Sequence, residues 1–199
     1  MQINIIHISD IHCNNEMLNK IIKLNYDILI SSGDFECLES AELFSNANNT
    51  FAVSGNMDDV SIMKLLSKNG ILLDGKIKRI NNITIAGIGG IDPRTNITSL
   101  RNELTKSNYK IDILISHNPP YGILDMTYFK IRAGLKELKE LSEFIKPKLH
   151  LFGHIHESQG IKEINKTTYI NPGPLYLGSY AEIILNQNVI AKIKNIANL

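Results

Sequence analysis

Five short apolar segments recur along this chain, and each stops at a residue that can bind a metal ion. Runs this short and this rich in isoleucine and leucine are typical of strands buried inside a sheet. The segments and their polar ends are 4–9 before Asp10 and His12, 27–32 before Asp34, 50–54 before Asn56, 112–116 before His117, and 149–152 before His154 and His156. The pattern predicts a sheet with ligand side chains gathered along one edge.

Segments with helical periodicity separate these strands, and they span 16–24, 39–47, 59–69, 98–107 and 134–146. A strand, a helix and a second strand in succession form a βαβ unit, whose strands are usually parallel. Turn pairs at Asp74-Gly75 and Asn81-Asn82 indicate antiparallel strands within 71–90. After Gly160 the chain reads as strands and turns only, with strands at 160–164, 168–170, 181–185 and 189–193. No internal linker or repeat is visible, so a single domain over 1–199 is expected.

Composition narrows the classes of function. The net charge of +1 argues against binding to duplex nucleic acid and favours a small anionic substrate. Cys13 and Cys37 are too few for a disulfide framework, so we expect small buried side chains in a reducing compartment. Residues 1–10 have no basic start, and no apolar run approaches the roughly 18 residues of a membrane helix. A cytoplasmic protein without a membrane partner is expected; the oligomeric state stays open, a homodimer included.

The polar ends of the strands supply only oxygen and imidazole ligands. Such donors suit divalent transition metals such as Mn, Fe, Zn, Co or Ni, whereas a structural zinc site usually has thiolates. Any single position also fits a buried histidine or a capping aspartate with no metal. Together the residues exceed the needs of one ion and fit two ions that share a carboxylate. The predicted ligands are Asp10, His12, Asp34, Asn56, His117, His154 and His156.

The order of these motifs resembles that of the calcineurin-like metallophosphoesterases. The resemblance covers nearly the whole chain, and a His-x-Pro-Pro loop makes it greatest for the small phosphodiesterase-type members. It implies an α/β fold, a four-layer αββα sandwich of two mixed β-sheets flanked by helices. The matching motifs are Asp10-x-His12, Gly33-Asp34, Gly55-Asn56-x-Asp58, His117-x-Pro119-Pro120, Gly153-His154-x-His156 and Asn171-Pro172-Gly173.

The resemblance also implies roles for these residues. Asp34 would bridge two metals, and the nucleophile would be a hydroxide held by both. Asp58 would orient a ligand or its loop. One metal would be held by Asp10, His12, Asp34 and His156, and the other by Asp34, Asn56, His117 and His154. The catalytic set would be Asp34, Asn56, Asp58 and His117.

Two departures from the family pattern bear on function. Met57 stands where most members have a histidine, so it can neither donate a proton nor contact phosphate as that residue does. Cys37 and Leu38 replace the aspartate and arginine of the protein phosphatases, which argues against that branch. Arg94 and Arg132 are candidates for a phosphate contact. The expected function is hydrolysis of a small phosphodiester; the alternatives are a phosphomonoesterase acting on nucleotides or small phosphates, and a non-catalytic scaffold such as the retromer subunit with this fold.

Overall fold

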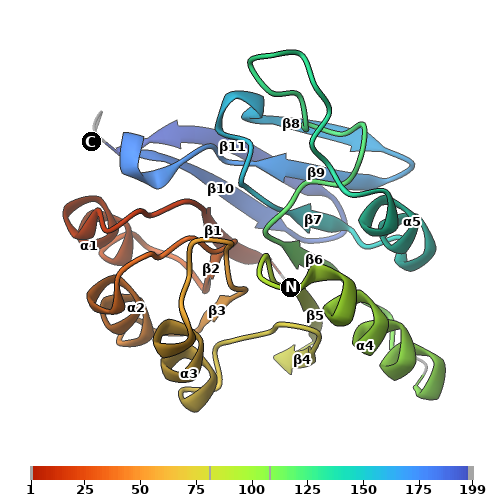
Figure 1. Ribbon diagram of the computed structural model, residues 1–199, viewed down its shortest axis with the longest axis horizontal. Coiled ribbons are helices and arrows are strands. Elements are labelled where there is room, and N and C mark those ends of the chain that lie inside the picture. The colour runs from red at the N-terminus through yellow and green to blue at the C-terminus, as the bar shows by residue number, and fades with distance from the viewer. Residues whose placement is uncertain (1, 81, 108, 197–199) are drawn as a thin grey trace.

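Two mixed β-sheets packed face to face form the centre of the protein (Figure 1). This computed structural model describes residues 2–80, 82–107 and 109–196, so residue 81 of the turn predicted at 81–82 lies outside the described part. Helices cover the outer faces of both sheets (Figure 1). The predicted four-layer αββα sandwich is therefore confirmed.

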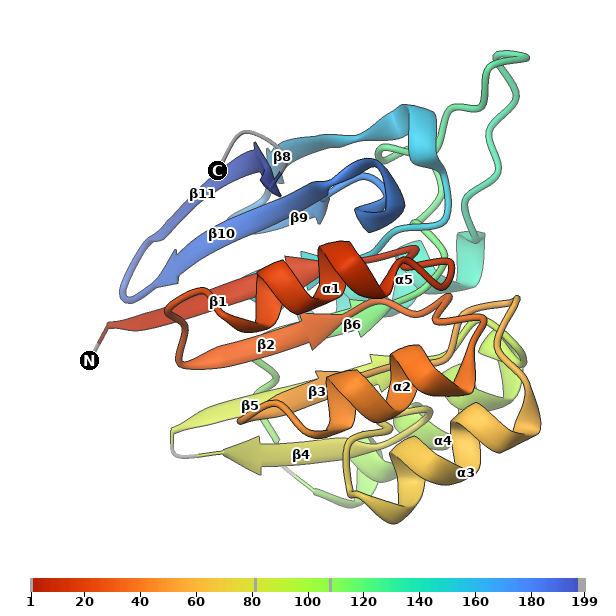
Figure 2. The ribbon, with the colours of Figure 1, turned by 90° about the vertical axis from the view of Figure 1, so that its left-hand side faces the viewer.

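The first sheet has the strand order β11-β10-β1-β2-β3. Its strands β1, β2 and β3 are parallel, and β10 and β11 extend the sheet in antiparallel fashion. Figure 2 shows β1, β2 and β3 running in one direction, so their carboxyl ends share one edge. The bounds are β1 Ile3–Ile8, β2 Ile28–Ser31, β3 Thr50–Ala52, β10 Ser179–Leu185 and β11 Val189–Asn195.

The second sheet has the order β4-β5-β6-β7-β9-β8. The four central strands are parallel, and the two edge strands β4 and β8 are antiparallel to their neighbours. The predicted all-strand tail is thus divided between the two sheets. The bounds are β4 Ile77–Ile80, β5 Ile83–Ile88, β6 Ile113–Ser116, β7 Leu149–Leu151, β8 Gly160–Ile164 and β9 Thr167–Asn171.

Helices α1, α2 and α3 cover the first sheet, and α4 and α5 cover the second (Figure 1). Helix α3 begins after Asp59, as predicted, because the Asp59 carboxylate accepts hydrogen bonds from two backbone N–H groups of the first turn. None of the described helices is long and apolar enough to cross a membrane. The bounds are α1 Asn15–Ile22, α2 Leu38–Ser45, α3 Val60–Lys68, α4 Pro93–Lys106 and α5 Lys136–Ile145, with short 3₁₀ helices η1 His156–Ser158 and η2 Leu175–Leu177.

The prediction for the start of α4 was wrong. The helix was expected to begin at residue 98, whereas it begins at Pro93 and includes Arg94 in its first turn. Asp92 caps this helix by accepting a hydrogen bond from the Thr95 N–H, and proline at the first helical position is well tolerated. The cap and the proline outweigh the weak apolar periodicity of this segment.

Alternate residues of each strand face different apolar layers. In β1, Ile5 belongs to the layer between the two sheets, and Ile6 packs under α1 and α2. The layer between the sheets is dense in isoleucine and leucine, including Ile30, Ile115 and Leu151. Full burial of each such side chain contributes roughly 1.5–3 kcal/mol to stability. This layer fixes the position of one sheet relative to the other.

A buried hydrogen-bond chain runs through β7 and β6. The Ser116 hydroxyl donates to the Asn118 carbonyl at 2.7 Å, so it accepts from His150 Nε2 at 2.9 Å. His150 Nδ1 must then accept from the Ser142 hydroxyl at 3.1 Å, and Ser142 accepts from the Tyr169 hydroxyl at 3.2 Å. These contacts fix His150 as a neutral imidazole, and its burial lowers its pKa to about 3.

The neutral His150 predicts acid-sensitive stability. Between pH 6.5 and 3 the unfolded chain binds a proton at this residue and the folded chain does not, so stability falls as the pH decreases. From pH 7 to pH 5 the loss from this histidine is about 2 kcal/mol. Urea unfolding at both pH values measures this loss of stability. In His150→Gln the loss should be smaller by about 2 kcal/mol, because glutamine keeps one donor and one acceptor but does not titrate. An identical loss in both proteins would contradict the prediction.

The expectation for the two cysteines was wrong. Cys13 is exposed and Cys37 is half-buried, and the two form a disulfide with a Cα–Cα distance of 5.3 Å. They lie 24 residues apart in sequence, but the loops after β1 and β2 are neighbours because those strands pair. Disulfides persist in oxidising compartments and are rare in reducing ones. The reducing compartment that we expected would therefore not have predicted this bond.

This disulfide should stabilise the fold by about 3 kcal/mol, because it restricts a loop of this length in the unfolded chain. When reductant is added, the melting temperature of the oxidised protein should fall to the value measured for the Cys13→Ser, Cys37→Ser double variant. The double variant itself should not respond to reductant. Thiol titration under denaturing conditions reports whether the bond is present. A protein that carries the bond and melts at the same temperature as the double variant would overturn this estimate.

Candidate metal centre

The seven predicted ligands lie together, in loops at the carboxyl ends of strands from both sheets. The first sheet supplies Asp10, His12, Asp34 and Asn56, after β1, β2 and β3. The second supplies His117 after β6, and His154 and His156 after β7. Hydrogen bonds join the two sets across the sheets. His117 Nδ1 contacts the Ser32 carbonyl at 2.8 Å, and the His154 backbone N–H donates to Asp10 Oδ2 at 3.1 Å.

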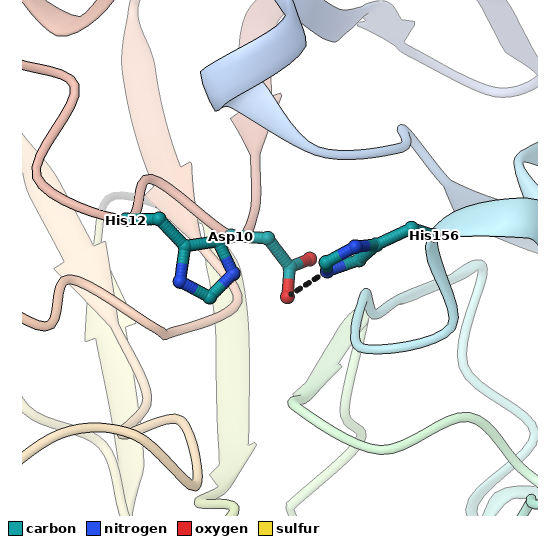
Figure 3. A group of neighbouring side chains, drawn as sticks. All are labelled: Asp10, His12 and His156. Carbon is teal, nitrogen blue, oxygen red and sulfur yellow. Dashed lines mark ion pairs between the residues drawn. The ribbon is translucent and has the colours of Figure 1, made fainter.

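One group of possible ligands consists of Asp10, His12 and His156 (Figure 3). Each offers one ligand atom, and these atoms all lie within 4.8 Å of one another. The Asp10 side chain points between the two imidazole rings (Figure 3). Asp10 Oδ1 lies 3.2 Å from His156 Nε2, yet this buried oxygen accepts no well-formed hydrogen bond from the described residues. A buried carboxylate oxygen left without a donor suits a bound cation.

The charge state of Asp10 agrees with a cation-binding role. Burial tends to raise the pKa of Asp10, but the close His156 ring and the neighbouring His117 outweigh burial and hold that pKa at about 2. The same contact with Asp10 raises the pKa of His156. Asp10 is therefore an anion at neutral pH, as a metal-binding carboxylate must be.

His12 is oriented by a residue that the sequence analysis did not identify. Its Nδ1 lies 2.9 Å from Glu36 Oε2, so its other ring nitrogen remains free to face Asp10, as Figure 3 shows. A carboxylate on the far nitrogen of a metal-binding histidine fixes its tautomer and orientation. Nothing in the sequence indicates this contact, because it depends on the folding of the loop after β2.

The second group consists of Asp34, His117 and His154, again with ligand atoms within 4.8 Å of one another. His117 Nδ1 donates its proton to the Ser32 carbonyl, so in the neutral ring Nε2 carries a lone pair. This nitrogen lies 2.7 Å from Asn56 Oδ1, 3.1 Å from His154 Nδ1 and 3.5 Å from Asp34 Oδ2. Asn56 Oδ1 and the Asp34 carboxylate can only accept, so their lone pairs and that of Nε2 repel unless a positive charge lies among them. The arrangement thus fits a cation.

The two carboxylates are held in the same way. Asp34 Oδ1 accepts a hydrogen bond from the Met57 N–H at 2.8 Å, and Asp10 Oδ2 accepts one from the His154 N–H. In both residues the second oxygen is left facing the imidazoles. The structure groups Asp34 with His117 and His154 and does not include it in the first group, so its bridging role stays a prediction.

Asp58 lies behind the ligands and holds their loop. Its carboxylate accepts hydrogen bonds from four backbone N–H groups, those of Asp34, Phe35, Glu36 and Gly55, at 2.7–3.2 Å. Burial raises the pKa of Asp58, and the backbone hydrogen bonds oppose that shift. The residue thus fixes the path of the loop between Asp34 and Asn56 and does not itself face the imidazoles.

The ligand loops have unusual backbone geometry. Asp10, His12, Asp34 and His154 all have positive φ, from 45° to 68°. Non-glycine residues pay roughly 1–2 kcal/mol for this left-handed conformation. At Gly153 the chain approaches Asp10 so closely that an added Cβ would lie 2.5 Å from Oδ2. The packing of the surrounding loops therefore holds the ligands in place against local strain.

Neither arginine proposed as a phosphate contact reaches the ligands. Arg94 is paired with Glu137 of α5 at 3.5 Å. Arg132 forms an ion pair with Asp125 at 2.9 Å inside the long loop 119–133. That loop is tied to the metal-binding edge by its backbone, since the Tyr128 N–H donates to Glu157 at 2.7 Å.

Two exposed side chains bear on the reactivity of the site. Met57, where most relatives have histidine, is 51% exposed beside Asn56. Tyr176 lies next to the first group, and its ring is 5.3 Å from that of His12 and 5.6 Å from that of His156. An open depression of about 460 Å³ is lined by Tyr176, His12, His156 and Asn14. No sequence motif indicates this position of Tyr176, because it depends on how η2 packs against the loop after β1.

Comparisons with known proteins agree with this geometry. A Methanocaldococcus jannaschii protein is 29% identical over 194 residues, which span 85% of this chain and 88% of that protein. Human metallophosphoesterase domain-containing protein 1 is 46% identical over 63 residues, which are 31% of this chain but only 19% of the human protein.

Solved structures share the fold at low identity. A Thermus thermophilus protein has a TM-score of 0.78 and 17% identity, with 98% of this chain and 100% of that chain covered. An archaeal phosphodiesterase has a TM-score of 0.60 and 18% identity, covering 96% and 99%. Vacuolar protein sorting 29 from Cryptosporidium parvum has a TM-score of 0.57 and 13% identity, covering 98% and 91%.

The sequence profile of the calcineurin-like phosphoesterase superfamily domain matches residues 3–184, which contain all seven predicted ligands and nearly all strands of both sheets. The resemblance inferred from the motifs is therefore confirmed over most of the chain. The protein belongs to the calcineurin-like phosphoesterase superfamily.

Proposed function

We propose that this protein is a metal-dependent phosphodiesterase that hydrolyses a small phosphodiester. The observation that carries the proposal is the convergence of carboxylate, amide and imidazole ligand atoms around His117 Nε2 and Asp10 Oδ1, which leaves positions for two cations. Two divalent ions bound there would supply a hydroxide nucleophile and offset the charge of the phosphoryl oxygens. The nitrogen and oxygen donors suit Mn, Fe, Zn, Co or Ni.

The protein contributes rigid positioning. One oxygen of Asp10 and one of Asp34 are held by backbone N–H groups, so the other oxygen of each is presented in a fixed direction. Asp34 lies 3.5 Å from His117 of the second group and also interacts electrostatically with His156 of the first, which supports its assignment as the bridging carboxylate. Asp58 maintains the loop that carries it. Such preorganisation lowers the cost of binding the substrate in a reactive geometry.

The charge of the site favours a diester over a monoester. A phosphate monoester carries more negative charge than a diester, and enzymes that bind monoesters commonly add arginines to the metals. Here Arg94 and Arg132 are both paired with carboxylates away from the ligands. A phosphomonoesterase acting on nucleotides or small phosphates is the alternative within the same chemistry. Faster turnover of p-nitrophenyl phosphate than of its diester would select it.

A non-catalytic scaffold is the alternative from another class, since vacuolar protein sorting 29 shares this fold. Buried acceptors that face one another destabilise a protein unless a cation lies among them, so this arrangement favours a metal-binding role. The contact of Glu36 with His12, which orients a candidate ligand, also favours a metal-binding role. We therefore favour the enzyme.

The first test of this function is Asp34→Asn. Purified protein should hydrolyse bis-p-nitrophenyl phosphate with at least one of Mn²⁺, Fe²⁺, Zn²⁺, Co²⁺ and Ni²⁺. The variant should lose more than about 100-fold in rate and bind both metals more weakly, because an amide bridges two cations poorly. Asp92→Asn is a matched control at a helix cap, where asparagine serves as well as aspartate. Two tightly bound metals and near-normal turnover in Asp34→Asn would show that Asp34 is not the bridge.

The two histidines of the His-x-His pair should hold different metals. His156→Ala should lose the ion at Asp10 and His12, and His154→Ala should lose the ion at Asp34 and His117. Anomalous scattering from crystals soaked in one metal would give the occupancy of each position in each variant. If both variants lost the same ion, the two groups would have to be reassigned.

A further inference from the structure

Tyr176 is the aromatic residue that lies against two predicted ligands. Its ring makes edge contacts with the His12 and His156 rings, at interplanar angles of 73° and 64°. It is 36% exposed and faces the open depression that it shares with both histidines. A molecule bound at the first metal group would therefore have the Tyr176 side chain beside it.

The backbone holds this residue firmly in place. The Tyr176 N–H donates to the Asp10 carbonyl at 3.3 Å, and the Asn14 side-chain amide donates to the Tyr176 carbonyl at 3.1 Å. The neighbouring Leu175 is fully buried, and its N–H donates to the Ser9 carbonyl at 2.8 Å. Helix η2 is thus pinned to the loop that carries Asp10 and His12, so Tyr176 keeps its position relative to them.

The Tyr176 hydroxyl forms no hydrogen bond with any described residue. The hydroxyls of Tyr26, Tyr169 and Tyr180 each have a partner within the protein, whereas those of Tyr109, Tyr121 and Tyr128 have none among the described residues. Tyr176 differs from these last three because its ring lies against two predicted ligands. A hydroxyl that is rigidly mounted beside a candidate metal centre and left unpaired is available to a ligand. The Tyr176 hydroxyl can donate a proton, whereas the Met57 side chain cannot, because a thioether has no acidic hydrogen.

We infer that the Tyr176 hydroxyl contacts the leaving oxygen of the substrate and protonates it. This inference rests on the proposed phosphodiesterase activity. As hydroxide forms a new bond to phosphorus, the bond from phosphorus to the leaving oxygen breaks and its electron pair stays on that oxygen. The Tyr176 O–H proton passes to this oxygen to give an alcohol, and the tyrosinate then takes a proton from water.

The contribution of this proton depends on the leaving group. An alkoxide is strongly basic and needs the proton, whereas a p-nitrophenolate is weakly basic and departs without it. General acid assistance is typically worth 10²–10⁴-fold in rate. Tyr176 would therefore let the enzyme cleave alkyl phosphodiesters, which is the chemical class of most natural ones.

Tyr176→Phe tests the inference by removing the hydroxyl and keeping the ring. With one fixed metal, kcat for an alkyl phosphodiester should fall by about 100-fold or more, and kcat for bis-p-nitrophenyl phosphate should stay roughly unchanged. Metal affinity measured by calorimetry should be unaffected, since the ring contacts remain. Tyr109→Phe is the matched control, because Tyr109 is also exposed but precedes β6, at the opposite edge of the sheet.

A second readout does not depend on turnover. Inorganic phosphate offers an oxygen in every direction, so its dissociation constant from the metal-loaded protein should rise at least about 10-fold in Tyr176→Phe, as for a lost hydrogen bond to a charged group. Equal rate losses for alkyl and aryl esters, no change in phosphate affinity, or loss of metal would each overturn the role of Tyr176. If the unmodified protein hydrolyses no ester with any metal, the proposed function fails, and the phosphate titration still reports whether Tyr176 contacts an anion.

Discussion

The apolar contact between the two sheets is the interaction on which the candidate site depends. Ile5 and Ile30 of the first sheet and Ile115 and Leu151 of the second belong to this one buried layer. Because both groups of ligands draw on both sheets, a shift of one sheet by a single residue would separate Asp10 from His156 by about 3.3 Å. The polar contacts of the site are thus set by side chains that take no part in its chemistry.

Much of this architecture follows from short stretches of sequence. Apolar runs identify the strands, and the parallel strands of a βαβ unit must end at a common edge, so Asp10, Asp34 and Asn56 could be placed together without coordinates. Helix boundaries were less secure where a local cap competes with periodicity, as at Asp92 and Pro93.

Contacts between distant loops could not be predicted in this way. The pairing of Cys13 with Cys37, the carboxylate of Glu36 on His12 and the ring of Tyr176 all depend on how loops from different parts of the chain fold over the edge. Each residue alone has an ordinary interpretation, as a free thiol, a surface acid or a core aromatic. Only the three-dimensional arrangement gives them partners, and two of the three lie directly against predicted ligands.

The division of ligands between the sheets has a consequence for the way the protein matures. A nascent chain that has formed only strands β1, β2 and β3 has Asp10, His12, Asp34 and Asn56 but none of the three histidines that follow β6 and β7. Since His154 and His156 come late in the sequence, neither group of possible ligands is complete before synthesis has passed residue 154. A cation that needs every member of either group would therefore bind only after both sheets have contributed their loops.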